Sequence, residues 1–117
     1  MHELGVICKV IETVDDICVK ENIPYVDTIV LEIGELSGIV PFYIQNCFPA
    51  VTYNKDRFKN TKLEIEVVEG QAKCSKCGEV FNVVKNEGYC PSCGSFNKEV
   101  LGGLDFLVKE IRVPEEE

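Results

Sequence analysis

The chain has 117 residues, of which 45% are hydrophobic, and a formal net charge of −8 from 20 acidic and 12 basic residues. This length and apolar content suit one ordinary domain with at most one small insert. No apolar run approaches the roughly 20 residues of a membrane span, and the acidic excess disfavours nucleic acid, because phosphate binding depends on clustered Lys and Arg.

The sequence also bears on the compartment in which the chain works. It begins Met-His-Glu, without the basic start and apolar stretch of a signal peptide. We therefore expect a cytoplasmic location. Seven cysteines in a reducing compartment are expected to be thiols or metal ligands, and an odd number cannot all pair within one chain.

The first third of the chain predicts a helix followed by a strand. Apolar residues at three- and four-residue spacing indicate a helix from about residue 3 to 21, ended before Pro24. Its expected buried face consists of Leu4, Ile7, Cys8, Ile11, Val14, Ile17 and Cys18. Alternating Ile29, Leu31 and Ile33 then indicate a strand over residues 27–33.

A second helix is predicted to begin at Pro41, because proline suits the first turn of a helix. Its expected inner face consists of Ile44, Cys47, Phe48 and Val51. Pro49 lies inside this pattern and lacks a backbone donor, so we expect the helix to kink or stop there. Residues 54–60 are expected to form a polar connector.

The remaining strands flank a segment of different composition. Residues 63–67 alternate as a second strand, and a third runs from Leu104 to Val113 before an acidic tail, 115–117, that we expect to be disordered. Residues 70–98 are rich in cysteine, glycine and lysine and look like an insert. The sequence thus predicts an α+β fold: a three-stranded sheet with two helices on one face, formed by residues 1–69 and 99–117, plus an inserted four-cysteine ribbon at 70–98.

The strongest motif in the chain is a double CxxC pattern. Cys74-x-x-Cys77 and Cys90-x-x-Cys93 are separated by twelve residues, and a glycine follows each pair. Two tight turns of this kind complete a closed tetrahedral shell, which is typical of structural zinc. Redox CxxC pairs, unrelated core thiols and iron are the alternatives. With every position taken by protein, the ion would stabilise the fold and leave no place for substrate.

The start of the chain offers a second metal-binding pattern. His2 is the only histidine, and a lone histidine is usually a solvated surface residue. Nevertheless, the Met1 amine, the His2 backbone nitrogen and its imidazole can form linked chelate rings, a nitrogen set that favours square-planar Ni²⁺ or Cu²⁺. Such a site gains protons as pH falls and is easily unloaded.

Together these motifs resemble the HypA/HybF family of hydrogenase nickel incorporation proteins. The resemblance rests on Met1-His2-Glu3, the run from Glu32 to Gly38 and the two CxxC pairs. It implies a nickel metallochaperone, not an enzyme, in which Met1, His2 and Glu3 bind transient Ni²⁺ while the four cysteines hold structural Zn²⁺. It also implies a HypB-type GTPase partner and delivery to the large subunit of a nickel-iron hydrogenase, by a monomer or homodimer.

Two departures from the family and two rival functions stay open at this point. Pro49 and the run Asn54-Lys55-Asp56 depart from the family pattern and leave the course of residues 48–60 open. One rival is a zinc-ribbon adaptor that binds a protein or nucleic acid without nickel. The other is a thiol redox protein, which needs labile, reactive cysteines.

Overall fold

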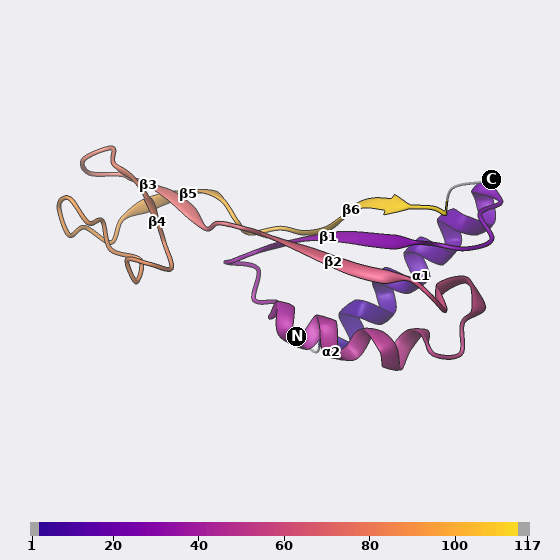
Figure 1. Cartoon of the computed structure of the whole chain (residues 1–117). Helices are drawn as coiled ribbons and strands as arrows, with labels where there is room; N and C mark the ends of the chain where they lie inside the picture. The colour runs from indigo at the N-terminus through magenta and orange to yellow at the C-terminus, as the bar shows by residue number, and fades with distance from the viewer. Residues whose placement is uncertain (1–2, 115–117) are drawn as a thin grey trace.

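The computed structural model describes residues 3–114. The molecule is elongated, with principal dimensions of 56 × 28 × 20 Å (Figure 1). Its elements in chain order are α1 (Glu3–Glu21), β1 (Thr28–Gly34), α2 (Pro41–Thr52), the 3-10 helix η1 (Asp56–Phe58), β2 (Lys62–Val68), β3 (Gln71–Cys74), β4 (Val80–Asn82), β5 (Lys98–Gly102) and β6 (Phe106–Arg112). The predicted acidic tail, 115–117, lies outside the described residues.

The main sheet has the strand order β2-β1-β6. β1 runs parallel to β2 and antiparallel to β6, and α2 lies in the connection from β1 to β2, as a parallel pair requires. Both helices cover one face, and the alternating Ile29, Leu31 and Ile33 of β1 are buried in the core beneath them (Figure 1). The predicted fold class, with three strands and two helices on one face, is confirmed.

Helix α1 buries Ile7, Ile11, Val14 and Cys18 of the face that the sequence predicted, but not the other three residues of that face. Leu4 and Ile17 are 50% and 40% exposed and Cys8 is exposed, whereas Val10 is buried. The core-facing residues are Ile7, Val10, Ile11, Val14 and Cys18. These five obey the same helical spacing, and Val10 is the one that the predicted face did not include. Cys8 is therefore wrong as a core residue, while Cys18 is fully buried.

Helix α2 was predicted to kink or stop near Pro49, and the structure shows that it does not stop there but continues to Thr52. Pro49 is exposed. Because proline has no backbone N–H, the carbonyl one turn earlier in the helix lacks its usual donor, and water can take the place of that donor. Beyond it, the Thr52 hydroxyl donates to the Phe48 carbonyl at 3.1 Å and the Tyr53 amide donates to the Pro49 carbonyl at 3.0 Å. Ile44 and Phe48 are buried, and Cys47 is partly buried against the same core, so packing holds the helix through the proline.

The connector at residues 54–60 is more ordered than its polar composition predicted. It contains η1, in which Phe58 is only 1% exposed and joins the core. Arg57 fixes the segment to the end of α1, because its side chain donates to Asp15 Oδ1 at 3.1 Å and to the Ile23 carbonyl at 2.9 Å. The connector thus closes one end of the main core.

The cysteine segment forms a second three-stranded sheet, with the order β4-β3-β5. β2 passes into β3 across Glu69 and Gly70, and β5 returns into β6 across residues 103–105. Both neighbours of β3 are antiparallel to it. The segment is therefore inserted between two strands of the main sheet, as predicted, and projects from one end of that sheet away from the helices (Figure 1). We call this second sheet with its turns the ribbon.

Candidate metal centre

The two CxxC turns of the ribbon have the same backbone geometry. The Cys74 amide donates to the Glu79 carbonyl at 2.8 Å, and the Gly78 amide returns to the Cys74 carbonyl at 2.9 Å. The turn at Cys90 repeats both bonds at 2.9 Å, to Ser95 and from Gly94. The two glycines have positive φ angles of 82° and 77°, which explains why glycine follows each pair.

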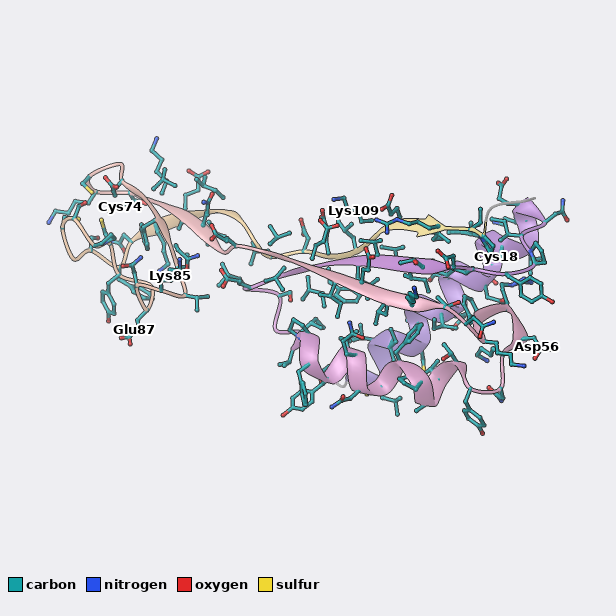
Figure 2. All side chains as sticks on the ribbon, viewed as in Figure 1. Cys18, Asp56, Cys74, Lys85, Glu87 and Lys109 are labelled. Carbon is teal, nitrogen blue, oxygen red and sulfur yellow. The ribbon has the colours of Figure 1, made fainter. Side chains whose placement is uncertain are left out.

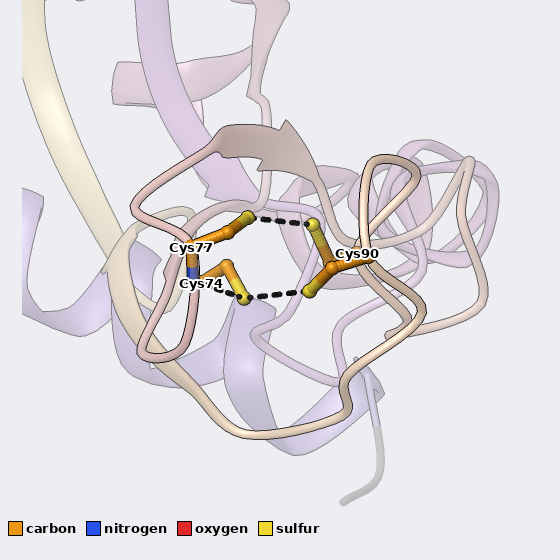
Figure 3. A group of neighbouring side chains, drawn as sticks. Cys74, Cys77 and Cys90 are labelled. Atoms are coloured by element: carbon orange, nitrogen blue, oxygen red, sulfur yellow. Dashed lines mark hydrogen bonds between the residues drawn. The ribbon is translucent and has the colours of Figure 1, made fainter.

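These turns bring four sulfur atoms together. The Sγ atoms of Cys74, Cys77, Cys90 and Cys93 all lie within 4.8 Å of one another. Cys74 Sγ is 3.6 Å from Cys93 Sγ, and Cys77 Sγ is 3.5 Å from Cys90 Sγ (Figure 3). The four sulfurs therefore form one cluster, with each of these short distances joining the two turns.

The dimensions of the cluster fit a tetrahedral zinc ion. Zn–S bonds of about 2.3 Å place the sulfurs of a tetrahedron about 3.8 Å apart, close to the two distances given above. The same distances far exceed the roughly 2.05 Å of a disulfide bond. Both of these contacts join one CxxC pair to the other, as expected for a single cage that draws its ligands from both turns.

Backbone donors prepare part of this cluster for deprotonation. The Cys77 amide donates to Cys74 Sγ at 3.5 Å and, as the main cause, lowers the pKa of Cys74 to about 6. For Cys77, the favourable amide of Glu79 is outweighed by hydrogen bonds with the neighbouring thiols, Cys90 first, which raise the pKa of Cys77 to about 12. Four thiolates so close repel one another, so a divalent cation is needed for all of them to ionise.

The four cysteines differ in their exposure. Cys74 and Cys90, the first of each pair, are buried at 1% and 3%, whereas Cys77 and Cys93 are exposed. Ala72 and Phe81 pack with the two buried cysteines in a core of their own, separate from that of the main sheet. Because this core is so small, the ribbon depends on its metal for most of its stability.

The structure places only one residue of the predicted nickel site. Met1 and His2 lie outside the described residues. Glu3 begins α1, and its Oε2 accepts a 3.5 Å hydrogen bond from the Val40 amide at the start of α2, a position where a carboxylate suits the helix dipole. Glu3 and the four cysteines are not brought together, since the cysteine cluster is in the projecting ribbon. Cys18, in the helical part, lies toward the opposite end of the molecule from Cys74 (Figure 2).

Sequence reasoning missed one polar residue that joins the two sheets. Glu35 Oε1 accepts a hydrogen bond from the Gly70 amide at 2.8 Å and another from Asn82 Nδ2 at 3.3 Å. Glu35 lies within the run from Glu32 to Gly38 that carried the family resemblance. That run was the available signal, but nothing in it indicated which distant atoms the carboxylate would contact.

Fold and site together define a small metal-binding protein: a helix-covered sheet that carries a four-thiolate cage on a projecting ribbon. Among residues 3–114, the cage is the one group of three or more potential metal-ligating side chains that lie close together. No helix in the same part of the chain is both long enough and apolar enough to cross a membrane.

Comparison with known proteins identifies the family to which this metal-binding protein belongs. A family model described as "Hydrogenase/urease nickel incorporation, metallochaperone, hypA" matches residues 1–113. The hydrogenase maturation factor HypA of Albidiferax ferrireducens is 36% identical over 113 residues, which cover 97% of this chain and 99% of that protein. HypA of Geobacter metallireducens is 38% identical over 114 residues, with the same coverages. The solution structure of the Ni metallochaperone HypA from Helicobacter pylori shares the fold, with a TM-score of 0.67, 22% identity and coverage of 99% of this chain and 100% of that chain.

The chain belongs to the HypA family of nickel metallochaperones for hydrogenase maturation. The resemblance inferred from the sequence is confirmed, and so is the function that it implied: the chain is a nickel metallochaperone. Nickel is its cargo, and the cysteine cage fits a structural zinc ion.

Proposed function

We propose that this chain takes up Ni²⁺ at its first three residues, Met1, His2 and Glu3, and holds a structural Zn²⁺ at the four clustered cysteines. It acts as a carrier and not as an enzyme. It works in the cytoplasm, receives help from a HypB-type GTPase and delivers nickel to the large subunit of a nickel-iron hydrogenase. The zinc ribbon corresponds to residues 70–98, and the nickel-binding part to 1–69 and 99–117.

The chemistry of the chain start supports the nickel site. A free amine, one backbone nitrogen and one imidazole form chelate rings that suit a square-planar ion. An α-amino group has a pKa of about 7.7–8.0, so nickel must displace a proton from it and binds less tightly as pH falls. The nickel affinity changes in this direction because protons and Ni²⁺ compete for the same nitrogens. A site of this kind releases its ion readily, as a carrier requires.

The position of the Glu3 carboxylate supports an auxiliary role for this residue in nickel binding. Its carboxylate lies at the start of α2, within 3.5 Å of the Val40 amide. The adjacent positive end of the helix dipole disfavours a cation, and a negative charge beside His2 offsets this effect. Removal of that charge should weaken nickel binding without affecting the distant cysteine cage.

The assignment of the cargo ion to the chain start, and of zinc to the cage, follows from the donor sets. Four thiolates leave no open position, so an ion there contributes folding energy and stays bound. The observation that carries the proposal is the combination of such a closed cage with a family identity built on nickel transfer. A zinc-ribbon adaptor would show the same cage but would not bind nickel.

Metal titrations of four variants test the proposal. His2→Ala and a version with a few residues added before Met1 should each abolish tight Ni²⁺ binding in calorimetry. Glu3→Gln should weaken it by about tenfold or more, whereas Glu12→Gln, which removes an exposed charge from the same helix, should not change it. Every variant should retain about one zinc per chain. Unchanged nickel affinity in both His2→Ala and the extended chain would overturn the nickel site and favour the adaptor.

A further inference from the structure

The ribbon and the main sheet meet at a narrow junction of three chain segments. Two are covalent: residues 69–70 connect β2 to β3, and residues 103–105 connect β5 to β6. The third segment, residues 34–36, consists of the last residue of β1 and the two residues after it, beyond which the chain turns toward α2 and does not enter the ribbon (Figure 1). Two extended strands alone would form a flexible neck, so the third segment decides how firmly the ribbon is held.

Backbone hydrogen bonds join this third segment to the connection at residues 103–105 and to the end of β2. The Gly34 amide donates to the Asp105 carbonyl at 2.8 Å, and the Leu36 amide donates to the Gly103 carbonyl at 2.7 Å. On the other side, the Glu35 amide donates to the Val68 carbonyl at 2.9 Å. Successive amides thus bond alternately to the two strands and close the neck at its base.

The Glu35 carboxylate extends this attachment into the ribbon itself. Its Oε1 accepts from the Gly70 amide at 2.8 Å and from Asn82 Nδ2 at 3.3 Å. Asn82 ends β4, one of the two edge strands of the ribbon. The Gly70 carbonyl accepts from the Val83 amide, just after β4, at 2.8 Å. One side chain of the main part therefore bonds both to the beginning of the ribbon and to one of its edge strands.

Close packing at the junction leaves little room for the ribbon to rotate. Gly70 is buried, and a Cβ atom placed on it would lie 2.6 Å from Leu36 Cγ. Gly103 is also buried, has a φ of 91°, and has the Glu69 carbonyl oxygen 2.6 Å from where its Cβ would be. The Leu36 side chain thus lies directly against the Gly70 backbone, and the backbone of Gly103 lies directly against that of Glu69 and Gly70.

We propose that Glu35 is a positioning residue, which fixes the ribbon on the main sheet so that the two sheets tumble as one rigid body. The metal cage is then presented at a set angle to the helical part. The effect depends on the length of the Glu35 side chain, because the oxygen must reach two donors in the ribbon. A glutamine keeps that oxygen in place, whereas an aspartate keeps the charge but is one carbon shorter.

Residual dipolar couplings of backbone amides, measured on the zinc-loaded full-length chain, test this proposal. In the unmodified protein, one alignment tensor should fit the amides of both sheets. Glu35→Ala and Glu35→Asp should each require a separate tensor of smaller magnitude for the ribbon, and Glu35→Gln should retain a single tensor. Glu66→Ala is the matched control, because Glu66 is an exposed glutamate that bonds to Lys109 within the main sheet.

Amide hydrogen exchange at Gly70 provides a second measurement. Loss of its carboxylate acceptor in Glu35→Ala or Glu35→Asp should speed exchange by about tenfold or more, with no comparable change in Glu35→Gln or Glu66→Ala. Zinc content should be the same in all variants. Two tensors in the unmodified protein would overturn the proposal, and so would a single tensor in both Glu35→Ala and Glu35→Asp, whatever the exchange rate at Gly70. If Glu35→Ala does not fold, the contrast between Glu35→Asp and Glu35→Gln decides the question.

Discussion

Cys77 Sγ and Cys90 Sγ lie 3.5 Å apart, although the two residues belong to different CxxC pairs. Cys74 and Cys93 make the other short contact between the pairs, at 3.6 Å. Each turn therefore supplies half of one cage, and neither half can satisfy a tetrahedral ion alone. It follows that the loss of any one sulfur should affect both turns.

Replacement of Cys90 by serine should accordingly release the metal and loosen the whole ribbon. Cys90 is buried in the small ribbon core, which is too small to stay folded without its ion. We expect zinc content, measured by atomic absorption, to fall well below one per chain. Amide resonances of residues 71–102 should lose their dispersion while those of the main sheet stay unchanged.

Cys47→Ser is the matched control for this experiment, because Cys47 lies in α2 and packs against the main core. It should lose some stability but keep its zinc. A stoichiometric zinc content in Cys90→Ser would show that the four-cysteine cage is not the zinc site.

The cysteines outside the cage should differ in their reaction with iodoacetamide. Burial, which outweighs the opposing effect of Arg57, raises the pKa of the Cys18 thiol, and the side chain is fully buried. Since the thiolate is the nucleophile, a raised pKa and lack of access both slow alkylation. Cys8 is exposed and should react first.

Peptide mass spectrometry of the zinc-loaded protein at pH 8 measures this order directly. Cys18 should become labelled only after the protein is unfolded by denaturant. Equal labelling rates for Cys8 and Cys18 under native conditions would contradict the observed orientation of α1.

The difference between Cys8 and Cys18 also shows how far the sequence could predict this fold. Helical periodicity correctly placed a helix at residues 3–21, but Cys8 and Val10 both fit a buried stripe of that period. Only the position of the sheet beneath α1 decides between them, and the sequence does not specify that position. Periodicity therefore determines the type and extent of a helix better than its rotation.

Long-range contacts account for what was missed elsewhere. The cysteine spacing was sufficient to predict the cage because each CxxC turn is a local structure. Phe58 and Glu35 gave no comparable local signal: one is a single apolar residue among polar neighbours, and the other is an exposed acid. Their roles arise from partners more than twenty residues away, such as Asn82, which only the folded chain brings near.

Phe58→Ala should therefore destabilise the protein strongly, in spite of its polar surroundings in the sequence. Phe58 is 1% exposed and is among the largest fully buried side chains. Removal of a buried phenyl ring costs about 3–5 kcal/mol through lost burial and the cavity that remains. Tyr53→Ala, a similar truncation at a residue 82% exposed, should change stability by less than about 0.5 kcal/mol. Urea unfolding monitored by circular dichroism would compare the two, and similar midpoints would contradict the buried position of Phe58.

The same substitution, glycine to alanine, should have opposite effects at two positions of the main domain. Gly34 ends β1 at the junction, where an added Cβ would clash with the backbone of Gly103. Gly103 cannot easily move, because its own backbone lies against Glu69 and Gly70. Gly34→Ala should therefore cost about 1–3 kcal/mol through overpacking.

Gly5 lies in α1 with no atom within 4 Å of an added Cβ, so Gly5→Ala should stabilise the protein by about 0.5–1 kcal/mol through a higher helix propensity. Urea midpoints shifted in opposite directions, at equal slope, would support the close backbone approach at the junction, whereas an unchanged midpoint for Gly34→Ala would show that the junction has room to relax.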